Sequence, residues 1–182
     1  MAAATLPNPP MSNRQDLIVK RLTEEGQKTA SYFAGLAAAE LEQQVYVTGP
    51  TWRVRDILAH FVSAEQTLKF YGMQIMGGGP GAPEDFIIDE FNAIQVNGLR
   101  AAEPSDLVQR FVEARAATVE LVRGMVDSDL DRIGRHPWFG NVPLEQMLKL
   151  VYRHNMLHER DVRRALETGQ PVPHVDAQPV AR

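Results

Sequence analysis

The feature of this sequence that most constrains its fold is a repeating apolar pattern in four long segments. They span roughly residues 12–38, 51–76, 105–125 and 141–168, and in each the apolar residues recur at steps of three and four. This spacing places the apolar residues on one face of an α-helix, and no segment shows the alternation typical of a strand. At 1.5 Å per residue each helix would extend about 30–40 Å, so the four match in length. The pattern predicts an all-α four-helix bundle.

The connections between these helices are of unequal length. Thr51 is the predicted N-cap of the second helix, and a Gly-Gly-Gly-Pro sequence at residues 77–80 ends that helix. A short extra helix at about residues 84–99 lies between the second and third helices, which lets that connection cross the bundle. Residues 126–141 form the other long connection and are expected to be a loop.

Chain length and cysteine content limit the domain count and the chemistry. The 182 residues suggest one domain, predicted to span residues 12–168, which is long enough to bury a core without covalent cross-links. Residues 1–11 and 169–182 are predicted to be disordered tails. Because the chain has no cysteine, disulfides, thiolate metal sites and a cysteine nucleophile are excluded.

The charge distribution argues against nucleic acid as a partner. The net charge is −4, and 19 basic residues are interleaved with 23 acidic ones instead of forming a basic face. The first residues lack the basic region and apolar run of a signal peptide, and no stretch approaches the roughly 20 apolar residues needed to span a bilayer. We therefore expect a cytoplasmic protein with no membrane partner.

Two histidines lie one helical turn apart in the last segment. His154 and His158 are four residues apart, so their side chains are about 40° apart around the helix axis and their Cβ atoms roughly 5–6 Å apart. His158 falls between Met147 and Val151 on the apolar face, and His154 lies at its margin. Two such imidazoles can bind one ion, because metal–nitrogen bonds of about 2.0–2.1 Å bring both rings to a common point. As an isolated pair they are equally consistent with two structural histidines.

A third histidine favours the metal interpretation. His60 lies early in the second helix, at the edge of its apolar face near Ala64 and Tyr71. Three imidazoles at core-margin positions of two packed helices would be costly to bury without partners, and one divalent ion would satisfy them all. Three neutral nitrogen donors suit zinc or nickel and not calcium or magnesium. Three protein ligands also leave a coordination position for water or substrate, as in catalytic sites.

These residues resemble the pattern of the DinB-like superfamily, whose members are metal-binding four-helix proteins. The matching segments are TWRVRDILAHFVSAE around His60 and HPWFGNVPLEQMLKLVYRHNMLHERDV around His154 and His158. The resemblance covers most of the chain, about residues 12–166. Relatives of the mycothiol-dependent maleylpyruvate isomerase type often carry glutamate at the position of His154, and this difference argues against that isomerase activity.

The resemblance also implies an activity class and partners. It implies a thiol-dependent transferase that acts on a small electrophilic substrate, with a divalent metal that activates the thiol of a cofactor such as mycothiol or bacillithiol. It further implies a homodimer. A non-catalytic or stress-related metal-binding bundle, a metal-dependent hydrolase, and a metal-free interaction module are the alternatives.

Charged and aromatic residues near the apolar faces supply further candidates. Glu65 and Arg115 interrupt the apolar faces of two helices and can form a buried ion pair, or Arg115 can bind an acidic substrate or cofactor beside the metal. Tyr71 can line the entrance near His60 and is a second candidate for cofactor binding. Asp161 can hydrogen-bond the second nitrogen of a ligand or pair with a neighbouring arginine.

Overall fold

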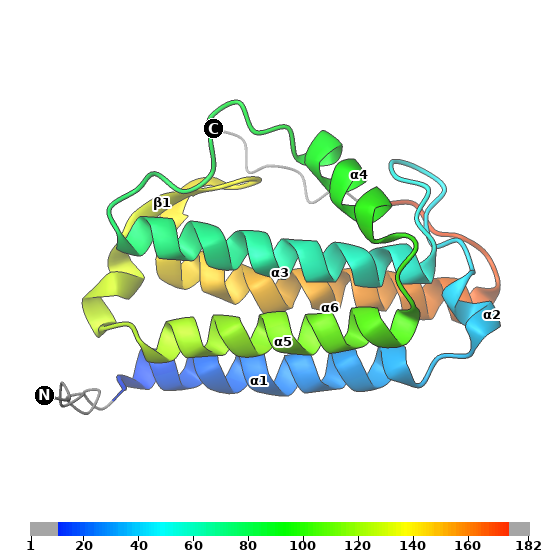
Figure 1. Ribbon diagram of the computed structural model, residues 1–182, viewed down its shortest axis with the longest axis horizontal. Coiled ribbons are helices and arrows are strands. Elements are labelled where there is room, and N and C mark those ends of the chain that lie inside the picture. The colour runs from blue at the N-terminus through cyan, green and yellow to red at the C-terminus, as the bar shows by residue number, and fades with distance from the viewer. Residues whose placement is uncertain (1–10, 175–182) are drawn as a thin grey trace, which may run out of the picture.

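The computed structural model describes residues 11–174, and four long helices run side by side in it (Figure 1). They are α1 (Asn13–Ala34), α3 (Val54–Met76), α5 (Pro104–Arg123) and α6 (Leu144–Thr168). These are the four segments that the apolar pattern predicts, so the four-helix bundle is confirmed. The predicted tail residues 1–10 and 175–182 lie outside the described part of the chain.

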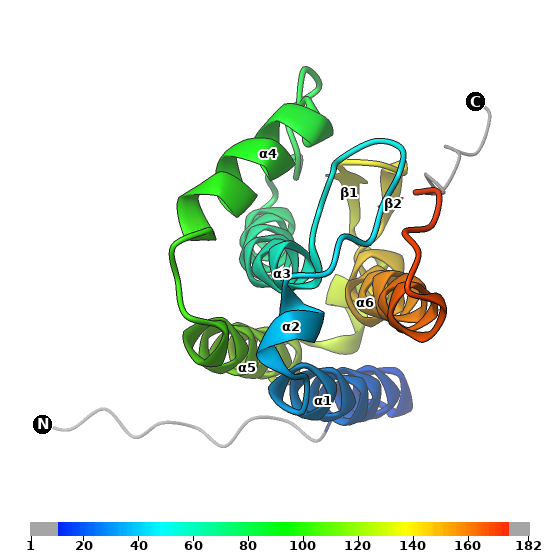
Figure 2. The ribbon, with the colours of Figure 1, turned by 90° about the vertical axis from the view of Figure 1, so that its right-hand side faces the viewer.

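The helices form a square in which each packs against two neighbours. Seen end-on, α1 lies beside α5 and α6, and α3 lies beside the same two helices (Figure 2). Their apolar faces form two clusters of buried side chains, one around Phe33, Phe61 and Phe111 and the other around Leu22 and Leu144. The bundle therefore buries the apolar faces that the spacing identifies.

The start of α3 differs from the prediction. The N-cap is Arg53 and not Thr51, and the Asp56 carboxylate accepts a hydrogen bond from the backbone N–H of Arg53 at 3.0 Å. The preceding residues are extended, because the Val45 N–H donates to the carbonyl of Trp52 at 2.8 Å. This backbone pairing keeps residues 51–53 out of the helix. A short helix, α2 (Ala38–Leu41), precedes the extended segment.

The connection over residues 126–141 is more regular than the expected loop. It contains a 3-10 helix, η1 (Asp127–Asp131), and a hairpin of β1 (Ile133–His136) and β2 (Gly140–Pro143). The strands are antiparallel, with His136 opposite Gly140. The sequence did not reveal them because four residues are too few to establish an alternating pattern. The extra helix between α3 and α5 is α4 (Ile88–Leu99), shorter than predicted.

The chain after α6 is ordered where a tail was expected. Gly169 ends the helix with a φ of 66°, and the following residues return along the segment that precedes α3. The Val172 N–H donates to the Val45 carbonyl at 2.8 Å, and the Val47 N–H donates to the Val172 carbonyl at 3.0 Å. We call residues 169–174 the C-terminal strap. The prediction of a tail from residue 169 is therefore wrong as far as His174.

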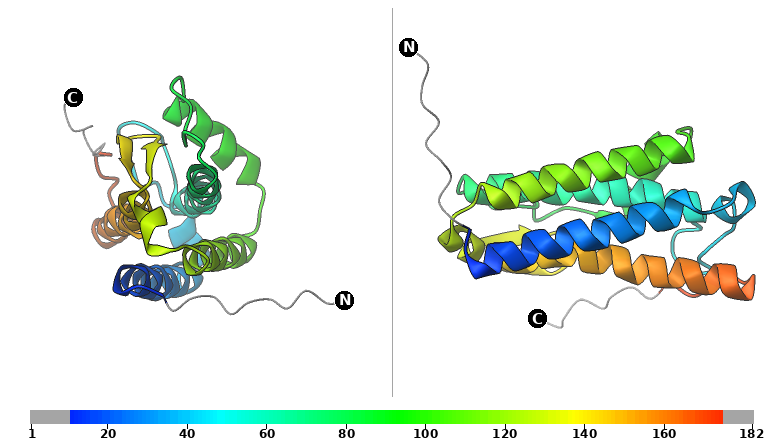
Figure 3. Two further views of the ribbon diagram at one scale, coloured as in Figure 1. Left: turned by 90° about the vertical axis from the view of Figure 1, so that its left-hand side faces the viewer. Right: turned by 90° about the horizontal axis from the view of Figure 1, so that it is seen from below.

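The segment between α2 and α3 and the β1–β2 hairpin cover the same side of the molecule. Both lie over α3 and α6, on the side that faces away from α1 and α5 (Figures 2 and 3). The candidate site lies at the covered interface between α3 and α6. In the described part of the chain, no helix is long and apolar enough to cross a membrane.

Candidate metal centre

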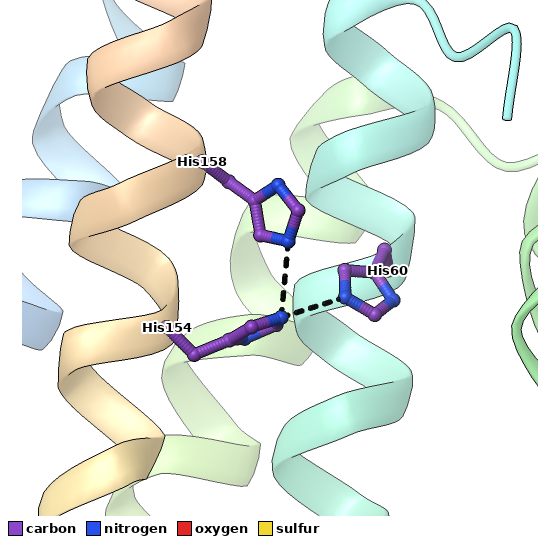
Figure 4. Close-up of side chains that lie close together, drawn as sticks. All are labelled: His60, His154 and His158. Carbon is purple, nitrogen blue, oxygen red and sulfur yellow. Dashed lines mark hydrogen bonds between the residues drawn. The ribbon is translucent and has the colours of Figure 1, made fainter. Parts of the chain in front are cut away.

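Three histidine rings meet at the interface between α3 and α6. His60 comes from the second turn of α3, and His154 and His158 come from consecutive turns of α6 (Figure 4). The Nε2 atom of His154 lies 2.9 Å from Nε2 of His60 and 3.0 Å from Nε2 of His158. The structure thus brings together the three histidines that were predicted from the sequence to be ligands.

The two distances from His154 fit one bound ion, and the ligand atoms of all three histidines lie within 4.8 Å of one another. Two nitrogens that each lie about 2.0–2.1 Å from the same metal are themselves about 3 Å apart, or slightly more. The rings are also in the right protonation state. Burial is the main cause that lowers the pKa of His154 to about 4 and holds the pKa of His60 and His158 well below its usual value. All three are therefore neutral at pH 7, which is the form that binds metal ions.

Hydrogen bonds alone satisfy this arrangement poorly. The Nε2 atom of His154 faces two ring nitrogens, and a single N–H there can be directed well at only one of them. The Nδ1 atom of His60 is buried and has no hydrogen-bond partner among the described residues, and an ion at Nε2 would leave it as it is. A divalent ion would accept all three Nε2 lone pairs at once. The donor set therefore fits a metal better than it fits a trio of hydrogen-bonded rings.

Aromatic side chains surround the rings and hold them in place. The ring of Trp52 lies 4.7 Å from that of His60 between centroids, tilted by 34°. The ring of His174, on the C-terminal strap, stacks on His158 at 5.8 Å and 12°. The Tyr46 hydroxyl lies 2.6 Å from Nδ1 of His158. Tyr46, Trp52 and His174 were not predicted from the sequence as parts of the site, since they lie in short extended segments with no periodic signal.

Tyr46 also joins the site to a charged residue. The Asp161 carboxylate, one turn beyond His158 on α6, acts electrostatically on the Tyr46 hydroxyl. Burial and this carboxylate raise the pKa of Tyr46, so the side chain stays a neutral hydroxyl. Asp161 additionally pairs with Arg160 at 3.1 Å, which is one of the roles predicted for it.

Arg115 forms the buried ion pair that was one of its two predicted roles. Its Nε and Nη2 atoms each donate to a carboxylate oxygen of Glu65 at 2.9 Å, and its Nη1 donates to the Leu22 carbonyl at 2.8 Å. Both charged side chains are almost fully buried. The guanidinium is thus held by protein groups, and binding of a cofactor by Arg115 stays a prediction.

Tyr71 lies away from the three rings. It is eleven residues beyond His60 on α3, which corresponds to about 16 Å along the helix axis. Its ring is buried in the second apolar cluster and lies 6.2 Å from the ring of Phe86. Among the described residues, Tyr71 makes no ring contact with the three histidines, so its role in cofactor binding stays a prediction.

A further buried histidine lies on the hairpin. The Nδ1 atom of His136 accepts hydrogen bonds from the backbone N–H groups of Trp138 and Phe139 at 3.1 and 3.3 Å. Burial, with a smaller electrostatic effect of His154, lowers the pKa of His136 to about 4. His136 does not belong to the three-ring cluster, and its contacts fit a structural role in the hairpin.

A broad surface groove between α1 and α6 lies elsewhere on the molecule. It is lined by charged side chains together with Tyr32, over whose ring the Arg163 guanidinium stacks at 3.7 Å. None of the three clustered histidines lines it. Its charged residues pair with one another, for example Arg163 with Glu159. We therefore place the candidate chemistry at the histidines and not in this groove.

Comparisons with known proteins agree with this fold. The family model of the DinB superfamily matches residues 21–162. The structure is similar to that of YfiT from Bacillus subtilis, described as a probable metal-dependent hydrolase with an unusual four-helix bundle topology. The TM-score is 0.70 at 18% identity, over 91% of this chain and 94% of that one. No curated protein matches the sequence. Because the family match covers most of the chain, this protein belongs to the DinB superfamily.

Proposed function

We propose that this protein is a divalent-metal-dependent enzyme whose ion is held by Nε2 of His60, His154 and His158. The observation that carries the proposal is the convergence of these three atoms, with His154 within 3.0 Å of both others. Neutral imidazole donors favour zinc or nickel. The resemblance to the DinB-like superfamily implies the same three ligands, and the distances between their Nε2 atoms support this ligand set.

The donor set leaves room for a reactant. No further histidine, aspartate or glutamate of the described residues joins the three-histidine group. A metal with three protein ligands keeps a position for an exogenous ligand, and it lowers the pKa of a water or thiol bound there. Aromatic rings pack around the histidines. Phe61, for example, lies 6.1 Å from His154 and 5.9 Å from His158 between ring centroids.

Thiol transfer to a small electrophile is the first candidate reaction. The superfamily resemblance implies it, and the absence of cysteine means that the thiol must come from a separate cofactor such as mycothiol or bacillithiol. In this reaction the three histidines hold the ion, and the apolar shell around them favours a desolvated and therefore more nucleophilic thiolate.

Hydrolysis is the second candidate, and the structural similarity to YfiT favours it. Here the nucleophile would be water in place of a thiol, and the protein residues would keep the same roles. A third possibility is a bundle in which the ion only ties α3 to α6. The two experiments below distinguish these cases.

The first experiment measures metal content by elemental analysis of untagged protein. We expect about one zinc or nickel ion per chain, lost in His60→Ala and in His158→Ala because two imidazoles bind too weakly to retain it. The control is His136→Asn, which removes a buried histidine outside the cluster and should keep the ion. Wild-type protein that stays metal-free after incubation with zinc and nickel would overturn the proposed site.

The second experiment separates the reactions. Metal-loaded protein is incubated with 1-chloro-2,4-dinitrobenzene plus mycothiol or bacillithiol, and separately with 4-nitrophenyl acetate in the absence of thiol. Conjugate formation that requires the metal and His158 supports the transferase. Ester hydrolysis with the same requirements supports the hydrolase. Stable metal binding with neither activity on a broader panel of electrophiles and esters supports the purely structural ion.

A further inference from the structure

The C-terminal strap brings a histidine ring onto the candidate metal centre. The ring of His174 is stacked on that of His158, with 5.8 Å between their centroids and 12° between their planes. It also meets the ring of Tyr46 edge-on at 4.5 Å. The Tyr46 hydroxyl in turn lies 2.6 Å from Nδ1 of His158. His174 therefore contacts both a candidate ligand and the side chain that is bonded to this ligand.

The orientation of His174 differs from that of a fourth ligand. The lone pairs of an imidazole lie in the plane of its ring, so an ion bound by Nε2 of His158 lies near the plane of that ring. The ring of His174 is stacked beside this plane and nearly parallel to it, which directs its nitrogens away from the ion. Among the described residues, the group that could hold one ion consists of the three clustered histidines. The ring of His174 therefore supports the site from outside the ligand set.

We propose that His174 is a positioning residue of the metal centre, whose ring holds His158 and Tyr46 in the geometry that binds the ion. This inference rests on the proposed metal site and extends it to the strap. An imidazole that must be ordered when the ion binds costs affinity, and packing that fixes the ring beforehand avoids this cost. Aromatic pairs with centroids about 4.5–7 Å apart also attract each other beyond the effect of buried area.

The sequence of the strap favours the extended conformation that carries His174. Gly169 reverses the chain after α6 with a φ of 66°. Pro171 and Pro173 fix their own φ angles, and each restricts the residue before it to extended conformations. Between the two prolines, Val172 supplies the N–H that donates to the Val45 carbonyl at 2.8 Å. Local sequence therefore lowers the entropic cost of ordering the strap against the bundle.

Backbone hydrogen bonds place the strap directly beside Tyr46. Val172 pairs with Tyr46 in a parallel bridge, and its carbonyl accepts from the Val47 N–H at 3.0 Å. The backbone N–H of His174 donates to Oγ1 of Thr48 at 3.0 Å. These bonds involve no metal ligand. The position of the His174 ring is thus set by the backbone and is available before an ion binds.

The ligand on α3 is reached by this ring only through another side chain. Trp52 lies 6.5 Å from His174 between ring centroids and 4.7 Å from His60. Removing the His174 ring should therefore disturb His158 and leave the packing of Trp52 on His60 in place. This difference between the two ligands gives the inference a signature that a general loss of stability would not produce.

Two substitutions separate the stacking of the ring from the chemistry of its nitrogens. His174→Ala removes the ring, whereas His174→Phe keeps a flat ring without nitrogens. Gln170→Ala, at an exposed position of the same strap, is the matched control. We expect the affinity for zinc and for cobalt(II) to fall about 2–10-fold in His174→Ala, and to stay at the wild-type level in His174→Phe and Gln170→Ala.

Two spectroscopic measurements show where the change occurs. The visible absorption of bound cobalt(II) at saturation reports the geometry of its ligands, and we expect an altered band in His174→Ala and the wild-type band in His174→Phe. In metal-free protein, 13C relaxation of the histidine rings should show a more mobile His158 in His174→Ala, with His60 unchanged. Thermal unfolding of the same samples verifies that each variant is folded.

The outcomes distinguish the positioning role from the metal site itself. Wild-type metal affinity or wild-type mobility of His158 in His174→Ala would overturn the inference. An equal loss of affinity in His174→Phe and His174→Ala would also overturn it, because a nitrogen of His174 and not its stacking would then be required. Wild-type protein with an ordered His158 ring and no affinity for zinc or cobalt(II) would instead overturn the proposed function, and with it the positioning role.

Discussion

At the scale of single residues, His136 makes the stability of this protein depend on pH. Burial lowers its pKa to about 4 in the folded chain, below the value of about 6.5 in an unfolded chain. Above pH 6.5 both states are neutral at this residue. Between pH 6.5 and 4 only the unfolded state takes up the proton. The free energy of unfolding therefore falls by about 1.4 kcal/mol for each pH unit because of this group.

His136→Asn should reduce this loss. The asparagine Oδ1 can accept the Trp138 and Phe139 N–H bonds in place of Nδ1, but the side chain does not titrate. We expect the free energy of unfolding of metal-free protein to fall less steeply from pH 6.5 to pH 4.5 in the variant, by up to the same 1.4 kcal/mol per pH unit. Denaturant titrations at several pH values measure this, and equal slopes would show that His136 is protonated in the folded state.

The Glu65–Arg115 pair is a second feature whose substitution has a defined outcome. Either Glu65→Gln or Arg115→Met leaves one buried charge without its partner, which costs about 3–5 kcal/mol of unfolding free energy. The double variant Glu65→Leu/Arg115→Met leaves no buried charge and should cost less than the two single changes added together.

The same double variant decides between the two predicted roles of Arg115. If the pair is structural, the double variant should fold, retain its metal and bind a thiol cofactor as the wild type does. A selective loss of thiol binding, with metal content unchanged, would instead assign Arg115 to the cofactor. Chemical denaturation, elemental analysis and a thiol-binding titration provide the three measurements.

At the scale of secondary-structure elements, the hairpin packs on α3 through a glycine. A Cβ atom added to Gly134 of β1 would overlap Cδ1 of Ile75, near the end of α3. No side-chain contact can be that close, so an alanine there must push the hairpin or Ile75 away.

We expect Gly134→Ala to lower the free energy of unfolding by about 1–3 kcal/mol, with partial recovery when Ile75→Val is added. Gly98 is the control, since it lies in α4 and an added Cβ would meet nothing within 4 Å. Gly98→Ala should therefore stabilise the protein by about 0.5–1 kcal/mol. Thermal or denaturant unfolding of the two variants should give opposite signs, and a neutral Gly134→Ala would show that the hairpin is loosely packed.

At the scale of the whole molecule, we predict a homodimer. Large apolar side chains are exposed on the long helices, among them Phe70 and Met73 on α3, each 53% exposed, and Met156 and Leu157 on α6, each 49% exposed. Sedimentation equilibrium should give about twice the chain mass of 20.3 kDa. Phe70→Glu and Met156→Glu then show which helix is buried between the copies, and a monomer at all concentrations would contradict the prediction.

Local spacing in the sequence determined the helices of this protein and two of its three candidate ligands. Apolar residues three and four positions apart share a helix face regardless of what packs there, so the four helices follow from sequence. The same geometry placed His154 and His158 side by side. The choice of His60 as third ligand drew on its position in α3, and the structure then placed its Nε2 atom 2.9 Å from that of His154.

Only the tertiary structure decided the surroundings of the site and the contacts that orient it. Tyr46 and His158 are 112 residues apart, and this separation leaves no periodic trace in the sequence. The helix faces predicted a Glu65–Arg115 pair as one of two possibilities, and the structure shows that the pair forms. The hairpin strands and the C-terminal strap are likewise too short to show a period, and they are held by backbone bonds to distant segments. Helix faces are set within a turn or two of chain, whereas these contacts exist only once the bundle has brought separate elements together.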